Sequence, residues 1–91
     1  MGRILMVEWI SVKDRLPDKN GKYLIVHCYY GYRSIEVWSF ALNLHDVDEY
    51  DFENDNHCGW YEYDQESGYF ERDGVSHWAE LPELPPKEEH I

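Results

Sequence analysis

The chain has 91 residues, of which 43% are hydrophobic and 16% aromatic, and its formal net charge at pH 7 is −11. This length suits one small domain, and the content of apolar and aromatic side chains excludes an intrinsically disordered chain. The negative charge disfavours direct binding to nucleic acid or to an anionic membrane, and it favours partners that carry a basic surface.

The first half of the chain predicts three β-strands. Residues 8–12 form a short run of strand-forming side chains that ends in a proline- and glycine-containing loop. Residues 22–30 alternate β-branched, aliphatic and aromatic side chains, which is typical of a long strand. Because Gly31 follows directly, residues 34–42 are predicted to return as its hairpin partner. We expect this hairpin to be buried on both faces.

The second half predicts shorter strands. Residues 60–63 and 69–72 are predicted to pair through a five-residue loop at 64–68 that ends in glycine. A last strand is expected at 75–78, and the proline-rich segment 81–86 is expected to lie extended along the sheet edge, because proline has no amide donor. The predicted fold is therefore mostly β, a small single-domain antiparallel sheet or partly open barrel.

The segment 43–56 shows neither helical nor strand periodicity, so it is predicted to be a loop with at most a short helix. We divide the chain into an N-terminal extension (1–7), one β-rich domain (8–86) with an acidic insertion (45–56), and a charged tail (87–91).

No stretch of the sequence has the length of a membrane span or of a signal-peptide core, which favours a cytoplasmic protein. Two cysteines, Cys28 and Cys58, fit a reducing compartment, and we expect buried free thiols.

Three ordered motifs give the chain a family resemblance. They are Trp9-Ile10-Ser11-Val12 with Asp14-Arg15-Leu16-Pro17, then Gly21-Lys22-Tyr23-Leu24-Ile25-Val26, and finally Val75-Ser76-His77-Trp78 with Leu81-Pro82 and Pro85-Pro86. Together they resemble the family known as domain of unknown function 551, over residues 9–86. The resemblance implies a small β-rich protein of bacteriophages and prophages with no established activity, so no catalytic residue carries over. The acidic stretch between Leu44 and Cys58 lies outside these motifs.

Charge is distributed very unevenly along the chain. Residues 1–44 carry six basic and four acidic side chains, whereas residues 45–91 carry two basic and fifteen acidic ones. Residues 46–71 contain no lysine or arginine and ten carboxylates: Asp46, Asp48, Glu49, Asp51, Glu53, Asp55, Glu62, Asp64, Glu66 and Glu71. The simplest interpretation is a solvated loop that maintains solubility, and the sharper one is a docking surface.

The docking interpretation assigns specific residues. In an extended segment, alternate carboxylates would stand about 6.7 Å apart on one side, which is of the order of phosphate spacing along a nucleic-acid strand. The predicted binding residues are the carboxylates Asp46, Asp48, Glu49, Asp51, Glu53 and Asp55 with the aromatic anchors Tyr50, Phe52, Trp60 and Tyr61. Such a surface could imitate nucleic acid and inhibit a host protein, a strategy that phages use.

Metal and cofactor sites are not predicted. The pairs His27-Cys28 and His57-Cys58 are adjacent residues, which point to opposite faces of a strand and cannot easily share one ion. The acidic run around Asp51 lacks the glycine and the closing glutamate of a calcium loop. Ser76-His77 and His57-Cys58 are sequence neighbours that seldom form a catalytic dyad, so we predict that the chain is not an enzyme.

A second hypothesis is a generic ligand-binding or assembly module, with no inhibition, that uses the surface around Trp9, Arg15, His77 and Trp78. Two weaker options also stay open. Lys13, Arg15, Lys19, Lys22 and Arg33 could capture a small anionic nucleotide. Tyr29, Tyr30, Tyr32, Tyr61, Tyr63 and Tyr69 could form a stacking platform, although we expect most of them to cover the core. The sequence predicts a monomer or a small homo-oligomer.

Overall fold

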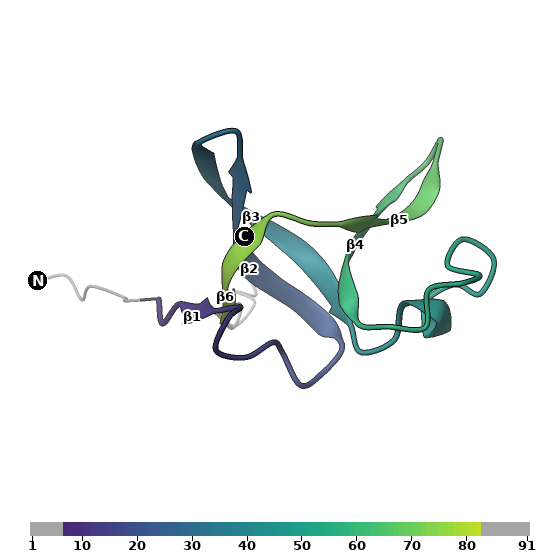
Figure 1. The fold of residues 1–91 in the computed structure, drawn as a ribbon, viewed down its shortest axis with the longest axis horizontal. Coiled ribbons are helices and arrows are strands. Elements are labelled where there is room, and N and C mark those ends of the chain that lie inside the picture. Colours follow the sequence, from purple (N-terminus) through teal and green to yellow (C-terminus); the bar gives the residue numbers. More distant parts are fainter. Residues whose placement is uncertain (1–6, 83–91) are drawn as a thin grey trace, which may run out of the picture.

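The computed structural model describes residues 7–82, which form one six-stranded antiparallel sheet. Its strands are β1 (Ile10–Ser11), β2 (Gly21–Tyr29), β3 (Tyr32–Ala41), β4 (Gly59–Asp64), β5 (Gly68–Arg72) and β6 (Val75–Glu80), and one 3-10 helix, η1, spans Leu44–Asp46. The strand order is β1-β6-β2-β3-β4-β5, as Figure 1 shows. The predicted fold class and the short helix in the acidic segment are confirmed.

The sheet curls without closing into a barrel. Asp73 and Gly74 carry the chain from β5, at one edge, to β6, which lies between β1 and β2 (Figure 1). The amide of Cys28 donates to the carbonyl oxygen of Gly74 at 2.8 Å, which fixes this connection against β2. The β2–β6 register shifts between Val26 and His27, and such irregularities bend a strand.

Two sequence predictions change at this level. Asp64 pairs with Gly68, so the β4–β5 loop has three unpaired residues and not five. The two cysteines are free thiols as predicted, but both are exposed, so the expectation that they are buried is wrong. Residues 1–6 of the predicted extension, the tail and most of the segment 81–86 lie outside the described residues. Among residues 7–82, no helix has the length and apolar character needed to cross a membrane.

The β2–β3 hairpin turns through two residues, since Tyr29 pairs with Tyr32. Tyr30 (φ 47°) and Gly31 (φ 84°) both have positive φ, which is the backbone of a type I′ turn. Glycine adopts this conformation freely, whereas tyrosine is strained there. The strain is therefore confined to Tyr30.

Replacing Tyr30 by asparagine is expected to stabilise the protein by about 0.5–1 kcal/mol, because asparagine tolerates positive φ. Thermal unfolding should show a rise in Tm of roughly 2–8 °C. Tyr32→Asn, which changes an exposed side chain on regular strand backbone, is the matched control. An unchanged or lower Tm for Tyr30→Asn would contradict the assigned turn strain.

One face of the sheet carries the main core. Its buried residues are Tyr23, Ile25, Trp38, Phe40, Trp60 and Trp78, with Ile10, Val12 and Val75 packed against them. The ring of Tyr23 meets those of Trp60 and Trp78 edge to face, with centroids 6.1 and 5.3 Å apart. Such pairs add to the free energy of apolar burial. The large aromatic side chains thus provide the apolar burial that a chain of this length needs for a stable core.

A polar network closes the rim of this core. The carboxylate of Glu36 accepts hydrogen bonds from the hydroxyl of Ser34 (2.7 Å) and from the indole N–H of Trp38 (2.9 Å), and it lies 3.4 Å from Nδ1 of His27. These hydrogen bonds, chiefly that from Ser34, hold the pKa of Glu36 below its ordinary value of 4.5. Folding therefore favours the ionised carboxylate.

This pKa shift makes a pH-dependent contribution to stability. Because the folded pKa is lowered, the contribution is fully present above pH 4.5 and is lost as the pH falls through the lowered pKa. Glu36→Gln should therefore flatten the acid side of the curve of unfolding free energy against pH, measured by urea denaturation. Asp14→Asn, at an exposed carboxylate, should leave that curve unchanged, and equal effects of the two variants would refute the assignment.

The opposite face of the hairpin is only partly covered, which corrects the expectation that both faces are buried. Val26 pairs with Ile35 on one side and with His77 on the other, so these side chains form a row across β3, β2 and β6. Val26 is buried, but Ile35 is 66% exposed and Val37 also faces solvent. We call the surface of Leu24, Val26, Ile35 and Val37 the open face.

Candidate functional site

The acidic segment 43–58, which we call the acidic lobe, is a folded element packed on the sheet. Phe52 is 2% exposed and shares a small second core with Ala41 of β3 and Leu44 of η1. Its ring lies 6.1 Å from that of Tyr61 and 6.3 Å from that of Tyr69. In Figure 1 the lobe stands at the opposite end of the molecule from β1. Phe52 thus fixes the lobe to β4 and β5.

Backbone hydrogen bonds close the lobe on itself. The amide of Leu44 donates to the carbonyl of His57 (2.9 Å), and that of His45 to the carbonyl of Asp55 (3.1 Å). The side chain of Asn43 caps η1 through the amide of His45 at 3.0 Å. The lobe is therefore a series of turns, as the predicted loop implies, and the even carboxylate spacing calculated for an extended segment does not apply to it.

Two of the predicted carboxylates serve the lobe's own structure. Asp48 Oδ1 accepts from the amides of Tyr50 (2.8 Å) and Asp51 (2.9 Å). Asp51 Oδ2 accepts from the amide of Tyr69 at 3.0 Å, and a Cβ built on Gly68 would lie only 2.6 Å from that oxygen. Asp48 shapes the turn and Asp51 ties the lobe to β5. Both therefore have a structural role in addition to their charge.

The other carboxylates face solvent without cationic partners. Asp46, Glu49 and Glu53 are exposed, and Asp55 is half-buried. Within residues 7–82, the ion pair of an arginine or lysine is Arg72–Glu62, and the other close contacts with carboxylates are those of His27 with Glu36 and of His57 with Glu71, so no lobe carboxylate pairs with a lysine or arginine. Like charges held together without neutralisation produce a negative local potential.

The predicted aromatic anchors divide into two groups. Tyr50 is 89% exposed at the surface of the lobe. Phe52 and Trp60 are buried and Tyr61 is half-buried against the second core, so the anchoring role predicted for Phe52 and Trp60 is wrong. These aromatic residues are close to the carboxylates in the sequence. The sequence did not show that Phe52 is part of a core formed with the sheet.

One mixed cluster of possible metal ligands was not predicted. Ligand atoms of Asp55, His57 and Glu71 lie within 4.8 Å of one another, and His57 Nε2 is 3.1 Å from Glu71 Oε1. A Cβ on Gly59 would lie 2.8 Å from Glu71 Oε2, so glycine leaves room for that carboxylate. One imidazole and two carboxylates could hold a divalent cation. The contact between His57 and Glu71 is also explained by a hydrogen bond between their side chains.

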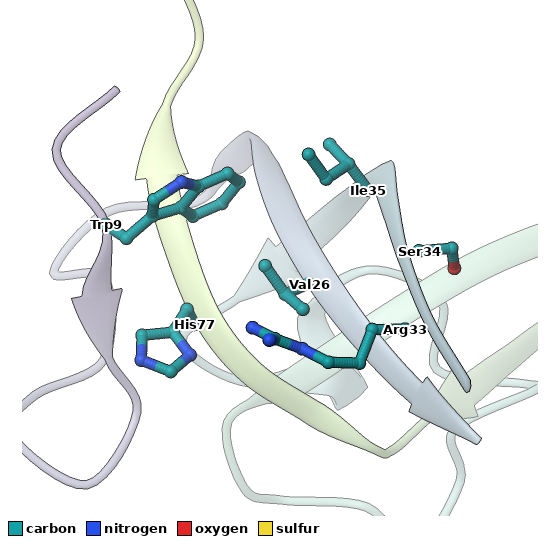
Figure 2. Close-up of a pocket in the computed structure, with 6 residues that line it drawn as sticks. All are labelled: Trp9, Val26, Arg33, Ser34, Ile35 and His77. Atoms are coloured by element: carbon teal, nitrogen blue, oxygen red, sulfur yellow. The ribbon is translucent and has the colours of Figure 1, made fainter. Parts of the chain in front are cut away.

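A pocket of about 320 Å³ opens over the other end of the sheet, and we call it the Trp9 pocket. Figure 2 shows its six lining residues: Trp9, Val26, Arg33, Ser34, Ile35 and His77. Val26 forms the floor, and the guanidinium of Arg33 extends from β3 toward His77. The hydroxyl of Ser34 is turned away and donates to Glu36. The pocket therefore has an apolar part and a cationic part.

The surface proposed for the second hypothesis is divided between the two faces. Trp9 and His77 line the Trp9 pocket, whereas Trp78 is fully buried in the core. The indole N–H of Trp78 donates to the carbonyl of Arg15 at 2.9 Å, and the Arg15 guanidinium lies 5.1 Å from its ring centroid. The four residues therefore form no common surface, and Trp78 with Arg15 stabilises the loop after β1.

The tyrosines also differ from expectation. Tyr29, Tyr30 and Tyr32 are exposed at the tip of the β2–β3 hairpin, and Tyr63 is exposed on β4. Tyr61 and Tyr69 pack against Phe52 instead. The prediction that most of these six residues cover the core is thus wrong for four of them. The sequence of the β2–β3 hairpin did not show that its tip extends beyond the core and leaves these tyrosines exposed.

The comparisons with known proteins identify the family. The sequence model described as "Protein of unknown function (DUF551)" matches residues 8–87. The chain belongs to the DUF551 family. Neither the curated proteins nor the solved structures include a significant match to this DUF551 chain.

The family match spans nearly all of the described structure, including the acidic lobe. The predicted family membership is confirmed, whereas the prediction that residues 45–56 are an insertion stays a prediction. The DUF551 description assigns no activity.

Proposed function

We propose that this DUF551 protein is a non-enzymatic interaction protein. Its acidic lobe binds a basic, nucleic-acid-binding surface of a host protein and thereby inhibits that protein. The host setting follows from the resemblance to phage and prophage proteins. The catalytic alternative has weaker support, because the histidine that contacts a hydroxyl, His77 with Ser76 at 3.0 Å, is its sequence neighbour, and such pairs seldom form a catalytic dyad.

The observation that carries the proposal is an ordered lobe whose carboxylates are not neutralised. Phe52 and the Asp51–Tyr69 hydrogen bond hold the lobe on the sheet, while Asp46, Glu49 and Glu53 face solvent without a lysine or arginine partner among residues 7–82. A preorganised lobe loses less conformational entropy on binding.

The lobe also offers an anchor of the type that protein interfaces need. Tyr50 is 89% exposed and lies between Glu49 and Asp51 in the sequence. Tyrosine is enriched among residues that dominate binding energies, whereas exposed charges mainly control association rate and specificity. Tyr50 would therefore supply apolar contact, and the carboxylates would orient the lobe toward lysine and arginine side chains.

Salt dependence tests this proposal. The tagged protein is used to capture partners from a host lysate at about 0.1 M salt, where charges act over about 10 Å, and the washes are raised to about 1 M, where they act over about 3 Å. We expect a basic nucleic-acid-binding protein that is released by the high-salt wash. A partner without a basic surface, or capture that resists about 1 M salt, would contradict the proposal.

A further inference from the structure

The Trp9 pocket lies far along the sheet from the acidic lobe and has a different chemistry. Three aligned residues, Ile35, Val26 and His77, cross β3, β2 and β6, and Ser11 of β1 pairs with His77 to continue that row. The floor and the cationic side of the pocket are thus built on β2, β3 and β6, and Trp9 lies directly before β1. Sites on paired strands hold their side chains more rigidly than sites on loops. Its volume of about 320 Å³ is at the lower end of the range for small-molecule sites.

The apolar part of the pocket is an uncovered surface. Ile35 is 66% exposed, and its neighbour across the floor, Val26, packs beneath the opening. The indole of Trp9 stands over the same opening in Figure 2. Exposed β-branched and aromatic side chains grouped around a hollow are typical of surfaces that bind an apolar group.

The cationic part selects the charge of the ligand. Arg33 lines the pocket and forms no ion pair with a carboxylate in residues 7–82. His77 lies beside it, with Nδ1 3.0 Å from the hydroxyl of Ser76. The pocket has no aspartate or glutamate in its lining, although the chain contains 19 acidic residues. An anionic group would therefore meet a guanidinium and an imidazole without a competing carboxylate.

We propose that the Trp9 pocket binds a small molecule that combines a flat apolar ring with one carboxylate or phosphate. The ring stacks against Trp9 and covers Val26 and Ile35, and the anionic group pairs with Arg33 beside His77. This site is separate from the acidic lobe, so it stands or fails independently of the proposed inhibition.

Direct titration tests the site with three probes. Indole-3-propionate carries a ring and a carboxylate, adenosine monophosphate carries a ring and a phosphate, and tryptamine carries a ring and a cation. We expect at least one of the two anions to bind, detected by calorimetry and by changes in the amide NMR signals of β2, β3 and β6. The anion that binds identifies the carboxylate or the phosphate as the preferred group. Absence of binding by both anions, or equal binding of tryptamine, would overturn the proposal.

Two matched variants locate the binding. Arg33→Gln should weaken anion binding at least about tenfold, because charge-assisted hydrogen bonds are lost. Lys22→Gln removes the same charge from β2 outside the pocket and should leave the affinity unchanged. Equal weakening by the two variants would indicate general charge attraction and would refute the site. Both variants replace exposed side chains, and their thermal unfolding should match that of the parent protein.

Discussion

Phe52→Ala is expected to detach the acidic lobe from the sheet and to lower the free energy of unfolding by about 3–5 kcal/mol. The reason is that Phe52 fills the second core between Leu44, Tyr61 and Tyr69, where no other lobe side chain could replace its ring. Urea denaturation measures the loss. Hydrogen exchange should show lost protection at the amide of Tyr69, which donates to Asp51.

Tyr50→Ala is the matched control, because it removes an aromatic ring from the same lobe at an exposed position. Its unfolding free energy should stay within about 0.5 kcal/mol of the parent value. If Phe52→Ala were no more destabilising than Tyr50→Ala, the lobe would not be held by the second core. The lobe would then not be a preorganised docking surface.

Neutralising Asp46, Glu49 and Glu53 together is expected to weaken binding of the captured partner at least about tenfold, or about 1.4 kcal/mol. The variant Asp46→Asn, Glu49→Gln, Glu53→Gln avoids Asp48 and Asp51, whose carboxylates accept backbone hydrogen bonds. Stability should stay equal or rise, because repulsion between like charges falls. Binding is measured by calorimetry at about 0.1 M salt, with thermal unfolding in parallel.

A second triple variant controls for net charge. Glu8→Gln, Asp14→Asn and Asp73→Asn remove three exposed carboxylates outside the lobe. The partner affinity should change much less than in the lobe variant. Equal weakening by the two triple variants would show that binding depends on total charge and not on the lobe.

Most of the fold could be predicted from local sequence. Alternation over residues 22–30 and the glycine at position 31 gave the β2–β3 hairpin, and strand-forming runs between turn residues gave β4, β5 and β6. These signals are local, because backbone preference and turn chemistry act within a few residues. Strand order could not be predicted, since β6 pairs with β2 and β1 through contacts distant in sequence.

The candidate sites were harder to predict, because a side chain can bind a partner only if it is exposed, and the sequence is a poor guide to exposure. Phe52 lies among carboxylates in the sequence, which predicts that it contacts a binding partner. In the structure it packs on Ala41 and covers the end of β3. Ile35 was assigned to a buried face, but no element among residues 7–82 covers it. The sequence does not show which part of the sheet the lobe packs on. It therefore predicted neither the burial of Phe52 nor the exposure of Ile35.

Competition with nucleic acid tests the central claim most directly. The captured partner is saturated with a labelled nucleic acid that it binds, the DUF551 protein is added in increasing amounts, and the fraction of bound nucleic acid is followed by fluorescence anisotropy. If the acidic lobe occupies the basic groove, the two ligands should exclude each other, and the lobe triple variant should displace at least about tenfold less effectively. A stable ternary complex, with anisotropy undiminished at saturating protein, would contradict it.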